Sequence, residues 1–413
     1  MSLTPTVDDE TTINIEASER IFQSLPRDGS IRVVHIQPGS YADNIVCRLE
    51  QAQCLGDSPS YDALSYVWGT FGTEECIDLG GEKFRVTPNL GQALRGLRDN
   101  EKAVTLWIDA LCITQTDNAE KAEQIRLMGD IYKRARRVVA FLGGHEDGSW
   151  ELFRILKLEK SGRRSEMDPF RLHDIQLAER LLLRRRYWQR AWVVQELVLA
   201  SDKYLQCGSD RISFSTLEAF HTWITSDVIL EQYPETDSPR PVPNVGPGPG
   251  AILHSEKLVA YPNKWHSRFE QLASTESHLS LAKFLTGFLE SQCKDPRDHI
   301  YAFYNLLPAD FQRETNINYD TAADKLICQA MRAIVKVTRS LNIITLRSRQ
   351  ASPAEEWQDA LPSWCPFLGV PYMNPPEGVD DVKGLHVRAS DDNPTFLFPR
   401  EVSALGSSEQ EPS

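Results

Sequence analysis

The chain has 413 residues, of which 41% are hydrophobic and 25% charged, which is the composition of an ordinary globular protein. At about 150 residues per domain, its length corresponds to two or three domains. Lys and Arg total 45 and Asp and Glu total 58, so the formal net charge is −13. Because binding to phosphate groups requires a basic surface, this charge argues against nucleic acid or an anionic membrane as the main partner.

The cysteines and histidines indicate no metal site. The eight cysteines form no C-x-x-C pair and the nine histidines form no H-x-x-x-H pair, so the usual zinc-binding spacings are absent from the sequence. The N-terminus is acidic and polar, unlike a secretory signal, and no run of about 18 apolar residues predicts a membrane span. We therefore expect a cytoplasmic protein with reduced thiols.

Short apolar runs alternate with amphipathic helical patterns in the first half of the chain. The predicted strands are 31–37, 45–51, 61–68, 76–79, 83–86, 104–109, 138–142 and 203–207. The predicted helices are 88–98, which Thr87 caps, one that begins at the Asp117 cap, and a long one over about 175–200. This alternation predicts a flavodoxin-like α/β domain over 30–210, with a mostly parallel sheet and helices on both faces.

The remaining segments have simpler patterns. Residues 1–28 carry little apolar pattern and are predicted to be a flexible arm, and Pro and Gly crowd 233–250, which reads as a linker or loop. Apolar stripes over 281–289 and 326–335 predict a smaller helical C-terminal region over 255–365. Residues 368–413 have the composition of a flexible tail.

Polar and aromatic residues stand where two of the predicted strands end. Ser65, Tyr66 and Trp68 close one strand, and Asp109 closes the next. In open α/β sheets the ligand binds at the carboxyl ends of the strands, so these four are the candidate substrate-binding residues. For Asp109 a capping role is an equal alternative, and for Asp117 capping is the favoured one.

Glu196 lies in an unusually apolar helical segment, RYWQRAWVVQELVLA. A carboxylate is costly to bury without a partner, so this side chain either faces a cleft or pairs with a base such as Arg190. From spacing alone the ion pair is the favoured alternative. Cys112 is a weak candidate nucleophile, because no histidine lies near it in the sequence and small buried cysteines are common.

Three segments resemble the signature blocks of the fungal heterokaryon incompatibility (HET) domain. They are YDALSYVWG, LWIDALCITQTDNAEKAEQIRLMGDIYKRARRVVAFLG and RRYWQRAWVVQELVLA, which span about 61–200. DPRDHIYAFYNLLP at 295–308 and LPSWCP at 361–366 are similar to segments that usually follow this domain. Thr114 stands where the family often has asparagine, which is a mild departure.

The resemblance implies a role in fungal non-self recognition and programmed cell death, and a remote kinship with Toll/interleukin-1 receptor (TIR) domains. In TIR enzymes a glutamate of a tryptophan–glutamate helix motif catalyses NAD cleavage, and Glu196 is the matching position. The resemblance thus implies Glu196 as catalytic residue and NAD as substrate rather than as a bound cofactor. The hairpin at 80–81 and the insertion over 143–174 depart from the TIR pattern.

That chemistry suits a carboxylate. Nicotinamide leaves the ribose as a neutral base, and a carboxylate beside the ribose stabilises the positive charge that develops. Tyr66 or Trp68 could stack on a ring of NAD. The alternative is a signalling module without activity, which triggers death through protein partners or self-assembly. For catalysis, Ser65, Asp109 and Glu196 must converge at one edge of the sheet, with Glu196 facing an open cavity.

Overall fold

The computed structural model describes residues 20–26, 28–54, 56, 59–69, 75–160, 172–224, 291–339 and 365. The chain divides into two compact units, and all of these residues belong to the first, Met1–Tyr372. Four predicted features lie wholly or largely outside the described residues, namely the arm over 1–28, the linker over 233–250, the stripe over 281–289 and the tail over 368–413. Within the predicted arm, Phe22 packs edge-on against Phe84, with 6.2 Å between the ring centroids.

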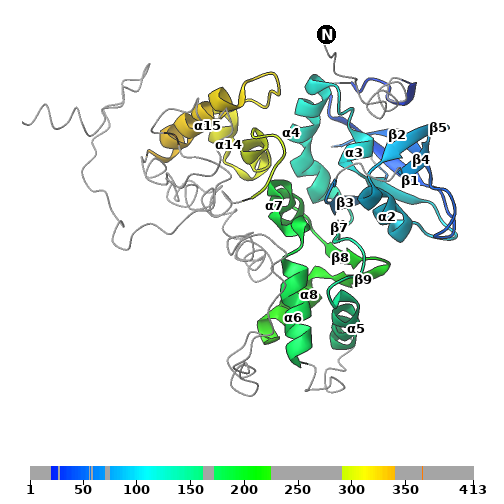
Figure 1. The fold of residues 1–413 in the computed structure, drawn as a ribbon. Coiled ribbons are helices and arrows are strands. Elements are labelled where there is room, and N and C mark those ends of the chain that lie inside the picture. The colour runs from blue at the N-terminus through cyan, green and yellow to red at the C-terminus, as the bar shows by residue number, and fades with distance from the viewer. Residues whose placement is uncertain are drawn as a thin grey trace, which may run out of the picture. The chain divides into compact units, whose positions relative to one another are not determined.

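One nine-stranded sheet organises the described part of the chain (Figure 1). Its strands are β1 (Ser30–Ile36), β2 (Val46–Gln53), β3 (Asp62–Tyr66), β4 (Glu75–Leu79), β5 (Glu82–Val86), β6 (Val104–Trp107), β7 (Val138–Phe141), β8 (Lys203–Cys207) and β9 (Asp210–Ser213). Their order across the sheet is β5-β4-β2-β1-β6-β3-β7-β8-β9. The sequence predicts each of these strands to within two residues, apart from β9, which it misses.

The centre of the sheet is parallel and its flanks are mostly antiparallel. β3 pairs in parallel with β6 and β7, and β7 pairs in parallel with β8. β1 is antiparallel to β2 and β6, β4–β5 and β8–β9 are antiparallel hairpins, and β2 makes a short parallel contact with β4. The predicted mostly parallel sheet is therefore wrong for the flanks. In β4–β5 and β8–β9 the reason is local, because a two-residue turn cannot make the crossover that parallel neighbours need. The fold is α/β with a mixed sheet.

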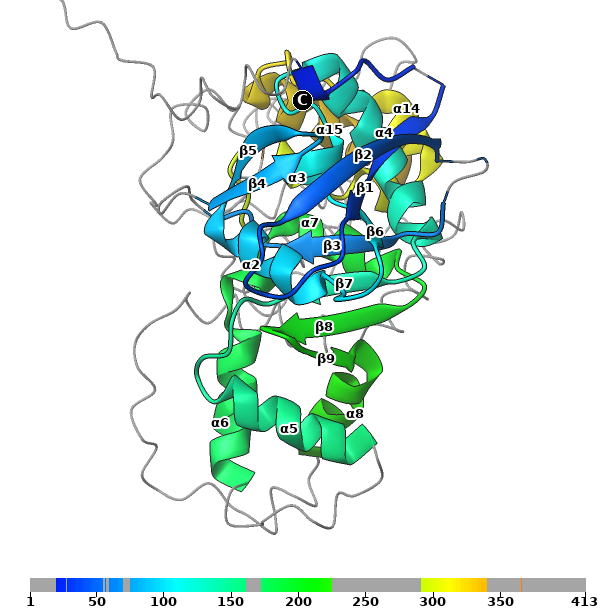
Figure 2. The same ribbon diagram turned by 90° about the vertical axis from the view of Figure 1, so that its right-hand side faces the viewer.

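Helices cover both faces of the central strands. α2 (Pro88–Leu97) lies on one face, and α4 (Asn118–Arg134) and α7 (Ala191–Val198) lie on the other, as two perpendicular views show (Figures 1 and 2). Thr87 and Asp117 accept hydrogen bonds from backbone N–H groups in the first turns of α2 and α4, which confirms both predicted caps. The same domain contains α3 (Asp109–Cys112), α5 (Ser149–Lys160) and α8 (Phe214–Ile224).

The long helix predicted over 175–200 is broken in two places. The segment forms α6 (Leu172–Leu183), the 3₁₀ turn η3 (Arg186–Gln189) and α7. The first break follows from Arg185, whose buried guanidinium donates to the carbonyls of Leu142 and Gly144 at 2.9 and 3.0 Å. The second break is at Arg190, which is extended because its backbone forms a β-bridge with Gln292. Both causes are contacts with distant segments, which a helical periodicity does not report.

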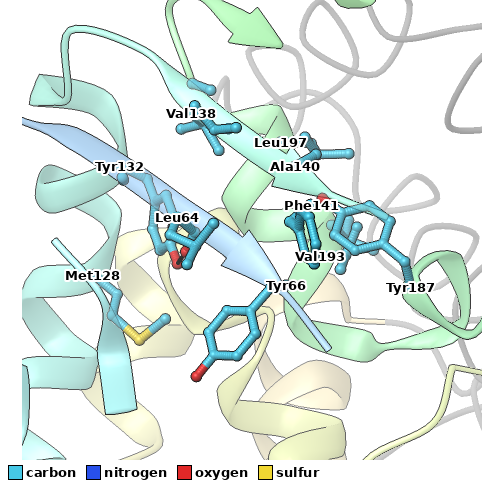
Figure 3. Close-up of a cluster of buried hydrophobic side chains, with 14 of the residues drawn as sticks. Leu64, Tyr66, Met128, Tyr132, Val138, Ala140, Phe141, Tyr187, Val193 and Leu197 are labelled. Carbon is cyan, nitrogen blue, oxygen red and sulfur yellow. Dashed lines mark hydrogen bonds between the residues drawn. The ribbon is translucent and has the colours of Figure 1, made fainter. Parts of the chain in front are cut away.

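The interface between the sheet and α7 is apolar. Leu64 of β3 and Ala140 and Phe141 of β7 form one buried cluster with Val193 and Leu197 of α7 (Figure 3). Burial of this kind is the dominant stabilising contribution in a fold, at about 25 cal/mol per Å². The packing fixes which side of α7 faces the sheet and therefore where its polar residues point.

Residues 291–339 add a second set of helices to the same compact unit. They are α13 (Asp298–Tyr301), the 3₁₀ turn η4 (Tyr304–Leu306), α14 (Ala309–Glu314) and α15 (Ala323–Thr338). α15 buries the stripe that the sequence predicts, from Leu326 to Ile334. In this set, α13 contacts α7 and η4 contacts α4.

Candidate functional site

A buried carboxylate lies at the carboxyl end of β3. Glu196, on α7, is 2% exposed, and its Oε2 accepts a hydrogen bond from the hydroxyl of Ser65 on β3. The same Ser65 hydroxyl lies 2.7 Å from the phenol oxygen of Tyr187, which is 1% exposed. β3 and α7 therefore bring together two of the predicted site residues that are 131 positions apart in the sequence.

Arg190 is close to this carboxylate but does not form the predicted ion pair. Its Nη1 donates to the carbonyl of Tyr66 at the end of β3. Among the described residues its guanidinium forms no ion pair, although burial, which lowers the pKa of Arg190, is outweighed by the nearby charges of Glu196 and Asp109, which raise it. The hydroxyl of Ser65, rather than a base, is thus the direct partner of Glu196.

The environment of Glu196 favours its neutral form. Burial raises the pKa of this carboxyl from 4.5 to about 7, against the opposing effects of the Arg190 charge and the Ser65 hydrogen bond. The nearby charge of Asp109 adds to the rise, and the Tyr132 hydroxyl of α4, which donates to the carbonyl of Leu64 at 3.4 Å, opposes it. Since the pKa lies near neutrality, Glu196 exchanges a proton under physiological conditions, which is the property expected of an acid–base or electrostatic catalyst.

Asp109 and Trp68 form the solvent-facing side of the site. The indole Nε1 of Trp68 donates to Oδ2 of Asp109 at 2.7 Å, and the Trp68 side chain is 39% exposed. Asp109 is the first residue of α3, its Oδ1 accepts from the N–H of Ala110 at 2.7 Å, and burial raises its pKa. The Asp109 carboxylate therefore accepts a local backbone hydrogen bond and also orients the Trp68 ring at the edge of the site.

Three buried tyrosines surround the carboxylates. The phenols of Tyr66, Tyr132 and Tyr187 are all at most 2% exposed, and burial raises the pKa of each well above 10. All three therefore remain protonated at neutral pH and can act as hydrogen-bond donors. Figure 3 shows Tyr132 beside Leu64 and Tyr187 beside Phe141.

The residues that sequence reasoning predicts for this site are Ser65, Tyr66, Trp68, Asp109 and Glu196, and two neighbouring tyrosines are not among them. Tyr132 and Tyr187 fall in apolar stripes, where a phenol has the same pattern as a core residue. Only the position of Tyr187, a few residues before Glu196 in the same block, offers a signal. Cys112 is buried, its Sγ accepts from the N–H of Ile108, and burial raises its pKa to about 12, so it is a core residue. That an open cavity lies beside Glu196 stays a prediction.

The described residues offer no cluster of three or more His, Cys, Asp or Glu side chains that could hold a metal ion. Nor do they include a helix that is both long and apolar enough to cross a membrane.

Comparison with known proteins places these residues in a family. Residues 61–196 match the family model described as heterokaryon incompatibility protein (HET). The chain contains a HET domain over this range. The matched range begins beside β3 and ends at Glu196, so the HET domain contains every residue of the candidate site named above.

One curated relative of this HET-domain protein is heterokaryon incompatibility protein 6, OR allele, from Neurospora crassa. The two sequences are 27% identical over an aligned length of 401 residues, gaps included, and the alignment covers 81% of this chain and 57% of the relative. The chain thus spans little more than half the length of that protein. No solved structure matches the chain.

Proposed function

We propose that this HET-domain protein acts in heterokaryon incompatibility as a trigger of cell death, and that it does so by cleaving NAD. The first part rests on the HET domain and on the name of the Neurospora relative. The second part rests chiefly on one observation, the buried Glu196 carboxylate that accepts a hydrogen bond from Ser65 at the carboxyl end of β3.

The order of the central strands supports a ligand site at this position. Along the sheet, β6, β3, β7 and β8 are the second, first, third and fourth parallel strands of the chain. This is the order of flavodoxin-like sheets, in which the connections leave the first strand in opposite directions and ligands bind at the carboxyl ends beside that point. Ser65 and Tyr66 end the first of these strands, so a flavodoxin-like or TIR-like assignment puts the substrate next to Glu196.

The chemistry is the hydrolysis of the bond between nicotinamide and ribose. The bond electrons leave with nicotinamide as a neutral base, and water adds to the ribose carbon, which yields ADP-ribose and a proton. Ionised Glu196 would stabilise the positive charge on the ribose in the transition state. The exposed indole of Trp68, held by Asp109, offers a surface on which a ring of NAD can stack.

The test is release of nicotinamide from NAD by the purified full chain, free and artificially clustered. We expect turnover by wild type and loss of about 100-fold or more in Glu196→Gln, which keeps the shape of the side chain but cannot carry the charge. Glu179→Gln is the matched variant, because Glu179 is a buried glutamate of α6 that pairs with His221 instead; it should retain activity. No turnover by clustered wild type would exclude the enzymatic proposal.

An assembly module is the second candidate, and the low exposure of Glu196 favours it, because a carboxylate held by hydroxyls also serves a purely structural role. Expression in a fungal host distinguishes the two. Lys133 and Arg134 are exposed in the last turn of α4, whereas Arg136 and Arg137 bind the buried Asp62 and must be left intact. If expression of Glu196→Gln still kills the host cells, whereas expression of the double variant Lys133→Glu/Arg134→Glu does not, the protein acts by assembly.

A further inference from the structure

Helix α7, which carries Glu196, is held from outside the family range by residues 291–339. The backbone of Gln292 accepts a hydrogen bond from the N–H of Ala191 at 3.0 Å. Asp298 Oδ2 accepts from the indole Nε1 of Trp192 at 3.1 Å. Asn305 Nδ2 lies 3.3 Å from the amide oxygen of Gln195. These contacts are made to the first residue of the helix, to its first turn and to a residue near its middle.

We propose that Asp298 and Asn305 are positioning residues, which hold α7 so that the Glu196 carboxylate stays against Ser65. The activity part of this inference rests on the proposed function, whereas the placement of Glu196 does not. Within the described part of the chain, neither Asp298 nor Asn305 forms a hydrogen bond with Glu196. They act through Trp192 and Gln195.

The shortness of α7 makes such support necessary. The helix has eight residues and its cap residue, Arg190, makes no side-chain capping bond. Isolated helices shorter than about 12 residues are marginal in water, so tertiary contacts determine where α7 lies. Trp192 precedes Glu196 by four residues and therefore lies on the same side of the helix, one turn away. A shift of Trp192 thus moves Glu196 with it.

Both proposed residues are themselves anchored. Asp298 Oδ1 accepts from the phenol of Tyr319 at 2.6 Å, and the ammonium of Lys121 on α4 lies 3.8 Å from the centre of that ring. Asn305 Nδ2 also donates to the carbonyl of Ile125 on α4 at 2.9 Å. The contact with α4 is close, because a Cβ on Gly129 would come within 2.8 Å of the Asn305 side chain. Asp298 and Asn305 therefore hold α7 relative to α4, not only to their own segment.

The structure provides a matched control for loosening this segment. Asn316 Oδ1 accepts from Arg126 Nη2 of α4 at 2.7 Å, so it also attaches residues 291–339 to the HET domain. Among the described residues its side chain forms no hydrogen bond with α7. Asn316→Ala should therefore weaken the docking of the segment without moving Glu196.

The experiment compares four variants of the full chain: Trp192→Phe, which removes the indole donor but keeps an aromatic ring, Asp298→Asn, Asn305→Ala and Asn316→Ala. One readout is nicotinamide release, for which we expect kcat to fall about 10- to 100-fold in the first three variants with KM changed less than about threefold.

The other readout is the ionisation of Glu196, followed by infrared spectroscopy with isotope-labelled glutamate. The Glu196 signal is assigned by its loss in Glu196→Gln. Loosening α7 admits water, so the pKa should fall from about 7 toward 4.5 in these variants. Its other neighbours, Arg190, Asp109 and the three tyrosines, are unchanged.

The two proposals fail in different ways. If wild type does not cleave NAD but the Glu196 ionisation shifts as described, the enzymatic function is wrong and the positioning role stands. If folded Trp192→Phe and Asn305→Ala keep both kcat and the Glu196 ionisation, the positioning role is wrong. It is also wrong if Asn316→Ala lowers kcat as much as they do, because the segment then contributes only general stability. Asp298→Asn, which preserves the size of the side chain, replaces any variant that does not fold.

Discussion

Glu196 combines two properties that conflict energetically. Its carboxyl is 2% exposed, so it lacks the solvation that stabilises a charge, yet Arg190, Ser65 and Tyr132 all favour the ionised form. The balance leaves the pKa at about 7. The proposed electrostatic catalyst requires this combination, because it must be ionised without being surrounded by water.

The raised pKa makes stability depend on pH in a defined direction. Between pH 4.5 and 7 the folded state binds a proton at Glu196 that the unfolded state has released, so the free energy of unfolding falls as pH rises. The whole change is about 3 kcal/mol and is complete above pH 7. We expect Glu196→Gln to lack this pH dependence. As the pH rises from 4.5 to 8, its free energy of unfolding should therefore increase by about 3 kcal/mol relative to that of wild type. Urea unfolding at a series of pH values measures this, and parallel curves for the two proteins would contradict it.

Ser65 should set the ionisation of Glu196. Its hydroxyl donates to the carboxylate and so lowers the pKa of Glu196. Ser65→Ala removes this donor, and a hydrogen bond to a charged group of about 1.5 kcal/mol corresponds to a rise of about one pH unit. We expect the pH profile of nicotinamide release to move upward by this amount. Tyr187→Phe removes only the hydroxyl that lies beside Ser65, so it should move the pH profile less. Equal shifts in the two variants would show that the effect comes from general disruption of the site and not from the Ser65 hydrogen bond.

At the residue scale the sequence singles out candidate residues but does not predict their contacts. Ser65, Asp109 and Glu196 are recognisable because polar residues at strand ends and a glutamate in an apolar helix are unusual. The partner of Glu196 is not predictable in the same way. Arg190 is nearer in the sequence, but its guanidinium donates to the carbonyl of Tyr66, and only the three-dimensional packing decides that Ser65 is the donor.

Among the elements, strands and capped helices follow from local pattern. β8 is found at its predicted bounds, and α2 and α4 begin after the predicted caps at Thr87 and Asp117. The break between η3 and α7 could not be predicted, because Gln292, about 100 residues away, pairs with the backbone of Arg190. The direction of β1 relative to β6 is equally invisible to periodicity, since an apolar strand packs in either direction.

The N-terminal end of α4 depends on a buried ion pair. Arg32 of β1 and Glu120 are 2.6 Å apart with side chains 2% and 9% exposed, and Glu120 also accepts from the N–H of Thr114 at 2.7 Å. Removing one member of a buried pair leaves the other charge without a partner. We therefore expect Glu120→Gln to lower the free energy of unfolding by about 3 kcal/mol.

A neighbouring glutamate of the same helix provides the comparison. Glu123 pairs with Arg126 at 3.0 Å, but both side chains are about one-third exposed. Exposed pairs contribute less than about 1 kcal/mol, so Glu123→Gln should change little. Denaturant unfolding of both variants measures the difference, and equal destabilisation would show that burial of the Arg32–Glu120 pair is not what makes it strong.

On the scale of the whole molecule, the family range and the functional unit do not coincide. The HET match ends at Glu196, but Gln292, Asp298 and Asn305, which hold the helix of Glu196, lie about 100 residues further on. They belong to the same compact unit as the sheet. Any assay of the proposed activity therefore requires the full chain and not the matched segment alone.

The most direct measurement is the initial rate of nicotinamide release from NAD by the clustered full chain between pH 5 and 9. Because only ionised Glu196 stabilises a cationic ribose, the rate of wild type should rise with pH through one ionisation near 7 and then remain constant. Glu196→Gln should show no such rise and less than about one-hundredth of the plateau rate. Equal rates in the two proteins across this range would contradict a catalytic role for Glu196.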